Sequence, residues 1–184
     1  NVNSGEVEYK FLSRVRLDAA VIGNHEFDAG ALNFTTQLKN QATFPVLAAN
    51  FAWDDPRQLD SNQTGLYTQP YTIKEMGGVR VGIVGMANIS SLNSLVEGGN
   101  SLQATPLEQN EAARAYVELL KPVTDLVVVV SHAGLTEDQD LVQGYEAFYE
   151  YGKIQQYLSR DANRWEILEW FEPATQIGMT ATPR

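Results

Sequence analysis

The sequence contains no cysteine and only two histidines among its 184 residues. The absence of cysteine excludes disulfides and thiolate metal sites, and it leaves the cellular compartment open. No apolar run reaches the roughly 20 residues of a membrane-spanning helix. No signal-peptide pattern and no initiator methionine are visible in these residues. We therefore expect a chain with no membrane span, which is a processed or truncated product.

Basic residues are also scarce. Lysine and arginine together number 13 against 23 aspartates and glutamates, so the formal net charge is −10. Without a basic run, the chain lacks the clustered charge that binding to a nucleic-acid backbone requires. A small phosphorylated substrate is still allowed if metal ions supply the positive charge. The apolar fraction of 43% is that of a folded globular protein.

The order of apolar segments predicts an α/β fold with layers of helices and strands. Gly77 and Gly78 predict the turn of a hairpin. In the first expected helix, Phe11, Leu12 and Val15 are predicted to form one apolar stripe. The expected helices span residues 6–17, 31–40 and 107–120, and the expected strands span residues 19–22, 44–49, 71–76, 79–86 and 126–130. Residues 52–70 and 88–105 are expected to form loops.

Each of the two histidines directly follows a predicted buried strand. Ligands of open α/β sheets gather at the carboxyl ends of the strands, which is where His25 and His132 are expected. The loop around His25 also contains Asn24 and Asp28. An asparagine oxygen can bind a divalent cation, an imidazole can donate a proton, and a carboxylate three residues later can orient that imidazole.

These residue types also have structural interpretations. A polar loop with asparagine, histidine and aspartate often forms only a turn, and Asp28 could cap the helix that follows it. His132 could equally be an ordinary loop histidine. The spacing of the residues leaves both interpretations open.

The segment Gly23-Asn24-His25-Glu26-Phe27-Asp28 resembles the Gly-Asn-His-Glu signature of the calcineurin-like metallophosphoesterases, and it is most similar to their 5'-nucleotidase branch. Residues 44–50, 79–86 and 125–140 also resemble this family, so the resemblance covers roughly residues 5–142. It implies an incomplete, layered α/β/β/α metallophosphoesterase domain over residues 1–144. The implied function is that of a metal-dependent phosphoesterase hydrolysing nucleoside phosphates or similar phosphomonoesters.

The resemblance also implies a role for each residue of the motif. Asn24 and His132 would bind the same divalent metal ion, which could be Mn, Zn, Mg, Ca or Fe. His25 would stabilise the transition state or act as general acid, with Asp28 orienting it. Glu26 belongs to the motif but is not usually a ligand. Two ligands of one metal must converge, so we expect Asn24 and His132 within about 5 Å of each other.

Three ligand blocks of that family do not occur in these 184 residues. They are an Asp-x-His block, a Gly-Asp block whose carboxylate bridges two metals, and a Gly-His-x-His block. We therefore expect weak metal binding and poor turnover by this chain alone. Members of this branch are commonly exported, so the resemblance implies an extracytoplasmic or periplasmic location.

Residues 145–184 differ in composition, because aromatic residues become dense there. We expect a junction at roughly residues 143–161 and a C-terminal segment of different origin, with a packed helix at residues 164–171 and a strand at residues 175–179. The last 20 or so residues resemble the Thr-Ala-Thr-Pro motif of superfamily 2 helicases and of type I restriction subunits. The resemblance implies a nucleic-acid motor fragment as an alternative function, although the chain has no Gly-x-x-x-x-Gly-Lys phosphate loop. A non-catalytic α/β domain is a third interpretation.

Overall fold

A computed structural model of the chain describes residues 2–53, 67–89 and 104–148. The chain divides into two units, Asn1–Leu141 and Val142–Arg184, and the first contains both histidines. The helix and strand predicted at residues 164–171 and 175–179 lie outside the described residues. The different origin of residues 145–184 therefore stays a prediction.

The described elements confirm the alternation of helices and strands that the sequence predicts. In chain order they are η1 (Val2–Gly5), α1 (Glu6–Arg14), β1 (Ala20–Val21), α2 (Ala31–Gln41), β2 (Val46–Leu47), β3 (Phe51–Trp53), β4 (Thr68–Gln69), β5 (Tyr71–Met76), β6 (Val79–Met86), β7 (Ala104–Pro106), α3 (Gln109–Leu120), β8 (Leu126–Ser131) and α4 (Leu135–Phe148).

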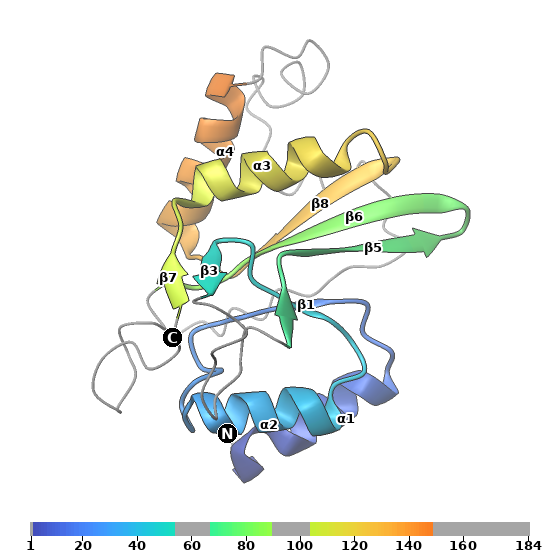
Figure 1. Ribbon diagram of the computed structural model, residues 1–184, viewed down its shortest axis with the longest axis vertical. Helices are drawn as coiled ribbons and strands as arrows, with labels where there is room; N and C mark the ends of the chain where they lie inside the picture. The colour runs from blue at the N-terminus through green and yellow to red at the C-terminus, as the bar shows by residue number, and fades with distance from the viewer. Residues whose placement is uncertain (1, 54–66, 90–103, 149–184) are drawn as a thin grey trace. The chain divides into compact units, whose positions relative to one another are not determined.

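The strands form three small sheets. One contains β1, β2 and β4 in parallel. A second contains β5, β6 and β8, in which the predicted hairpin pairs β5 with β6 antiparallel, and β6 pairs with β8 parallel. The third pairs β3 with β7 antiparallel, which the sequence did not predict. In Figure 1 the first two sheets lie between α1 and α2 on one side and α3 on the other.

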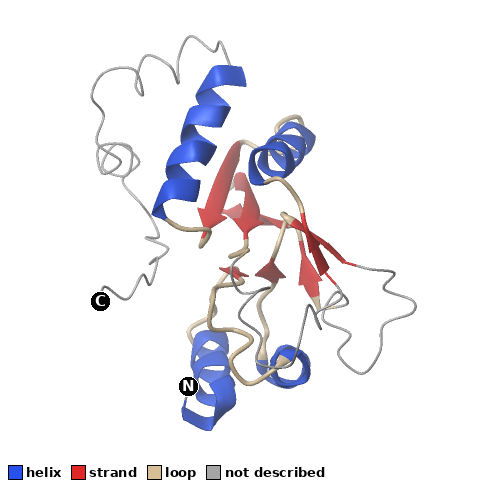
Figure 2. Cartoon of the chain, turned by 90° about the vertical axis from the view of Figure 1, so that its left-hand side faces the viewer, coloured by secondary structure: helices blue, strands red, loops and turns tan. Residues whose placement is uncertain are grey.

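Three buried clusters fill the spaces between these layers. The first packs α2 on β2 through Phe34, Leu38 and Val46, and Tyr9 and Leu12 of α1 pack against it. The second joins the two larger sheets through Leu47 and Ile83. The third packs α3 on the far side of β6 and contains Val84, Met86, Ala112, Ala113 and Leu120. The predicted α/β/β/α layering is therefore the observed one, and Figure 2 shows the helices outside the strands.

Of the predicted stripe of the first helix, only Leu12 packs on the core. Phe11 and Val15 are 61% and 55% exposed, while Tyr9 and Leu12 pack on the first cluster. Residues three apart on a helix share a face, so Tyr9 and Leu12 form the inward stripe. The helix also ends at Arg14 rather than at residue 17, since Arg16 has a left-handed φ of 58°.

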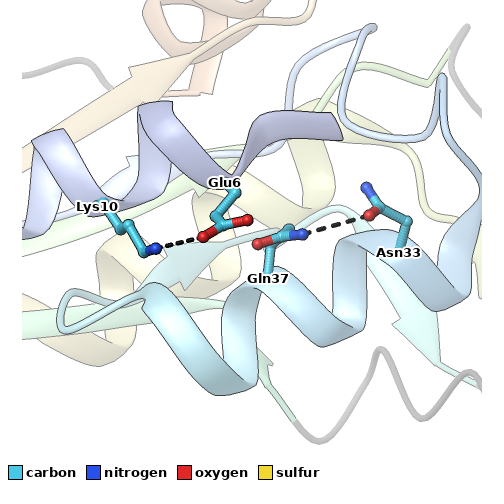
Figure 3. Close-up of polar contacts among 4 residues, drawn as sticks. All are labelled: Glu6, Lys10, Asn33 and Gln37. Atoms are coloured by element: carbon cyan, nitrogen blue, oxygen red, sulfur yellow. Dashed lines mark hydrogen bonds and ion pairs between the residues drawn. The ribbon is translucent and has the colours of Figure 1, made fainter. Parts of the chain in front are cut away.

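Helices α1 and α2 lie next to each other, as Figure 3 shows. Each contact drawn there joins two residues of the same helix. Lys10 donates to Glu6 in α1, and Nε2 of Gln37 donates to Oδ1 of Asn33 in α2. Such pairs four residues apart support their own helix by a few tenths of a kcal/mol. Asn33 also donates from Nδ2 to the Ser4 carbonyl at 2.9 Å, so it links α2 to the turn before α1.

A buried amide joins the end of β2 to the end of β6. The Asn50 side chain is 0% exposed, donates from Nδ2 to the Ala87 carbonyl at 2.9 Å, and accepts the Ala87 N–H at 2.7 Å. It therefore pairs with the main chain as a neighbouring strand would, which satisfies groups that would be costly to bury unpaired.

The sequence did not predict α4, which begins directly after Gly134 and continues into the expected junction. No helix in the described ranges is long and apolar enough to cross a membrane.

Candidate metal and catalytic site

The carboxyl ends of three strands meet at the candidate site. The amide N–H of Asn88, just after β6, donates to the Ile22 carbonyl after β1 at 3.0 Å. The amide N–H of His132, just after β8, donates to the Met86 carbonyl at the end of β6 at 3.0 Å. The loops that contain the two histidines therefore leave the sheets side by side, although more than 100 residues separate them.

The first loop is anchored by its one large apolar side chain. Phe27 is 4% exposed and packs edge-on against Phe34 of α2, with ring centroids 4.9 Å apart. Its neighbours Asn24, His25 and Asp28 are exposed. Burial of Phe27 therefore holds the polar residues of the motif at the surface.

Two members of the motif form a local pair. Nδ1 of His25 lies 2.8 Å from Oδ2 of Asp28. Since a carboxylate can only accept, the imidazole donates from Nδ1, and Nε2 faces away from this bond. The alternative role of Asp28 as a helix cap is not observed, because the N-cap of α2 is Gly30, with no side-chain cap bond.

The second loop is held by polar contacts on both sides of His132. The Ser131 hydroxyl donates to Oδ1 of Asp138 at 2.5 Å and accepts the Ala133 N–H at 3.2 Å. Gly134 follows with a φ of +134°, and a Cβ there would overlap a carboxylate oxygen of Glu137. A glycine at this position therefore allows the tight entry into α4.

The structure brings Asn24 and His132 together. Oδ1 of Asn24 lies 3.0 Å from Nε2 of His132, across a sequence separation of 108 residues. This is well within the 5 Å expected from the sequence. Two ligands at right angles with bonds of about 2.1 Å to one ion also lie about 3 Å apart.

The two residues fit a divalent metal by the chemistry of their donors. An amide oxygen and a neutral imidazole are both ligands of first-row divalent ions. Among the described residues, no group of three or more His, Asp or Glu side chains could hold a metal. Asn24 and His132 are therefore two candidate ligands by donor chemistry, and their role as metal ligands stays a prediction.

Glu26 lies beside this pair. A Cβ on Gly23 would stand 2.7 Å from Oε2 of Glu26 and 3.2 Å from Nε2 of His132. Oε2 is buried and has no hydrogen-bond partner among the described residues. Burial raises the pKa of the Glu26 carboxyl, while main-chain N–H groups and the two histidines lower it in part. A side chain at Gly23 would push the carboxylate and imidazole apart.

Sequence reasoning missed Asn88, which it placed in a loop. This asparagine is 8% exposed. Its Nδ2 donates to the carbonyls of His132 at 3.0 Å and Ala133 at 3.2 Å. Its position two residues after a buried strand was the available signal, because polar residues at that point face the carboxyl edge of the sheet.

Comparisons with known proteins show what the chain is similar to. No protein-family profile matches the chain. Human 5'-nucleotidase is 32% identical over 134 residues, which are 72% of this chain and 22% of that protein. The chain spans about a quarter of the length of the curated relatives it matches.

Solved structures show the same relationship. A 5'-nucleotidase precursor from Thermus thermophilus superposes with a TM-score of 0.60 and 32% identity, over 74% of this chain and 25% of that one. The calcineurin-like phosphoesterase YfkN from Bacillus subtilis superposes with a TM-score of 0.51 and 25% identity, over 69% of this chain and 38% of that one. The described part of the chain therefore has the calcineurin-like phosphoesterase fold, and the chain is similar to a segment of the 5'-nucleotidases.

Proposed function

We propose that this chain is part of the catalytic domain of a metal-dependent phosphoesterase that hydrolyses nucleoside phosphates or similar phosphomonoesters. The observation that carries the proposal is the 3.0 Å approach of Asn24 Oδ1 to His132 Nε2 at the joined ends of β1 and β8. The similarity to 5'-nucleotidases supports the nucleotide substrate class.

In this proposal Asn24 and His132 bind one divalent metal ion, whose identity is open among Mn, Zn, Mg, Ca and Fe. When bound, such an ion supplies Lewis-acid chemistry and lowers the pKa of a water ligand. Across residues 2–53, 67–89 and 104–148, no cluster of three or more His, Asp or Glu side chains adds further ligands. Two neutral ligands leave the positive charge of the ion uncompensated, so the chain alone binds metal weakly.

His25 acts on the phosphoryl group or on the leaving group. Its Nδ1 is held by Asp28 at 2.8 Å, which directs Nε2 outward from an exposed ring. A proton on Nε2 can then be donated to a phosphoryl oxygen or to the departing alkoxide. Asp28 stabilises the imidazolium and keeps the ring oriented.

The proposal extends to location and excludes broad nucleic-acid binding. Relatives named as snake venom 5'-nucleotidases are similar to this chain, which supports an extracytoplasmic location. The net charge of −10 argues against binding along a nucleic-acid backbone. The helicase-like stretch lies outside the described residues, and the relatives and structures compared above favour the phosphoesterase over the motor.

Hydrolysis of AMP and of p-nitrophenyl phosphate with added Mn²⁺ tests this function. We expect a slow rate that EDTA removes, that His25→Asn lowers by about 100-fold or more, and that Asp28→Asn lowers by about 10-fold. Asp125→Asn is the matched control, since Asp125 is an exposed aspartate that precedes β8 at its opposite end.

An unchanged rate in His25→Asn would remove the catalytic assignment. Failure of the wild type both to hydrolyse these esters and to bind Mn²⁺ at His132 would contradict the function. DNA-stimulated ATP hydrolysis would support the motor instead.

A further inference from the structure

We propose that Asn88 is a positioning residue that sets the distance between Asn24 and His132, and thereby the metal affinity of the site. This inference rests on the proposed function. It assigns a role to a residue that lies outside the Gly23–Asp28 motif and that is not one of the two proposed ligands.

Asn88 contacts both loops of the site. Its main-chain N–H donates to the Ile22 carbonyl, which is two residues before Asn24. Its side-chain amide donates to the carbonyls of His132 and Ala133. One residue therefore ties the main chain beside each of the two metal-binding side chains.

The burial of Asn88 makes its hydrogen bonds hard to replace. The residue is 8% exposed, so water cannot readily replace a lost amide donor. Its main chain follows β6, which pairs with β8 up to Met86 and Ser131. The strand pairing therefore determines where β8 ends, and the Asn88 amide determines how the chain turns after that end.

The geometry explains why an amide is suited to this position. Two carbonyl oxygens face the same nitrogen, and an NH₂ group has two protons to donate. Aspartate has the same shape but presents only acceptors to those carbonyls, and leucine has similar volume without donors. Both changes should free the His132 main chain while the strands remain paired.

Mn²⁺ titration followed by proton NMR tests the inference on the full chain. The Hε1 protons of the two histidines give two separate signals, which His25→Asn assigns. Bound Mn²⁺ should broaden the His132 signal in the wild type. We expect Asn88→Leu and Asn88→Asp to need about 10-fold to 100-fold more Mn²⁺ for the same broadening, as is typical when a partner of a metal ligand is lost.

The control is Gln109→Met. Gln109 is a buried amide, 9% exposed, that donates to the Glu137 carbonyl at 2.7 Å. Its loss should lower thermal stability but change the Mn²⁺ midpoint by less than about twofold. A purely structural role for Asn88 would make the Asn88 variants behave like Gln109→Met.

The possible results distinguish failure of this inference from failure of the proposed function. Mn²⁺ binding by the wild type, together with an unchanged midpoint in folded Asn88 variants, would overturn the inference alone. Absence of His132 broadening in the wild type would overturn the inference, and together with a failure to hydrolyse the esters it would overturn the function as well. If Asn88→Leu does not fold, Asn88→Ser decides the matter, because its single hydroxyl can serve only one of the two carbonyls and should give an intermediate midpoint.

Discussion

At the scale of single residues, the site combines one local pair and one distant pair. His25 and Asp28 are three residues apart in one loop, so the motif itself brought them within reach. Asn24 and His132 meet only because two strands end beside each other. The ligand and catalytic roles of all four residues remain predictions for the experiments above.

Tyr9 is a residue whose ionisation should be coupled to folding. Its ring stacks on Phe44 with centroids 6.0 Å apart. Burial, and in second place the charge of Glu26, raise the pKa of the Tyr9 hydroxyl well above its ordinary value. The folded state keeps the Tyr9 proton to a higher pH than the unfolded state does. Its free energy of unfolding therefore falls as pH rises past the unfolded pKa of about 10.

Tyr9→Phe should therefore flatten the decline of stability above about pH 10. Below that pH the tyrosine is protonated in both states, so the two proteins should differ there by no more than about 1 kcal/mol. Urea unfolding at pH 8 and at pH 11 measures the difference. If the free energy of unfolding fell equally in the two proteins between pH 8 and pH 11, ionisation of the Tyr9 hydroxyl would not destabilise the fold.

At the scale of elements, β6 is the strand on which the layers depend. It pairs with β5 and β8, and its two faces contribute to two different buried clusters. The sequence predicted this strand from its apolar run and the glycine turn. It did not predict how closely β2 approaches it.

Gly85→Ala should destabilise the fold by about 3 kcal/mol, at the upper end of overpacking costs. A Cβ there would overlap the Leu47 Cβ and stand 3.0 Å from the Leu47 main chain, which cannot move aside easily. Gly82→Ala is the matched control in the same strand. Its Cβ would meet mainly the flexible end of Leu120 at 3.1 Å, so we expect about 1 kcal/mol.

Chemical denaturation of both variants gives these free energies of unfolding. A Gly85→Ala protein as stable as Gly82→Ala would show that the two sheets can separate at this crossing without loss.

At the scale of the whole molecule, the chain matches only a segment of its much longer relatives. The relatives are about four times as long as the matched segment. The two candidate ligands are both neutral, and no group of three or more His, Asp or Glu side chains that could hold a metal occurs in the part of the chain that the structure describes. We therefore expect this chain to bind a divalent metal ion weakly.

Calorimetric titration with Mn²⁺ and with Zn²⁺ should show dissociation constants no tighter than about the millimolar to high-micromolar range. The physical reason is that each ion would exchange hydration for two neutral ligands only. His132→Ala should abolish the remaining binding. Tight, stoichiometric binding by the wild type would show that the chain supplies further ligands.

The sequence by itself determined the alternation of helices and strands, the hairpin turn at Gly77 and Gly78, and the candidate residues Asn24, His25, Asp28 and His132. These follow from local periodicity, from turn chemistry and from a short motif, all of which act between near neighbours in the chain. Only the tertiary structure decided that Tyr9, rather than Phe11 and Val15, joins Leu12 in facing the core. It alone placed Asn88 between the two loops and set Asn24 3.0 Å from His132, because those contacts depend on which strands pair and where each strand ends.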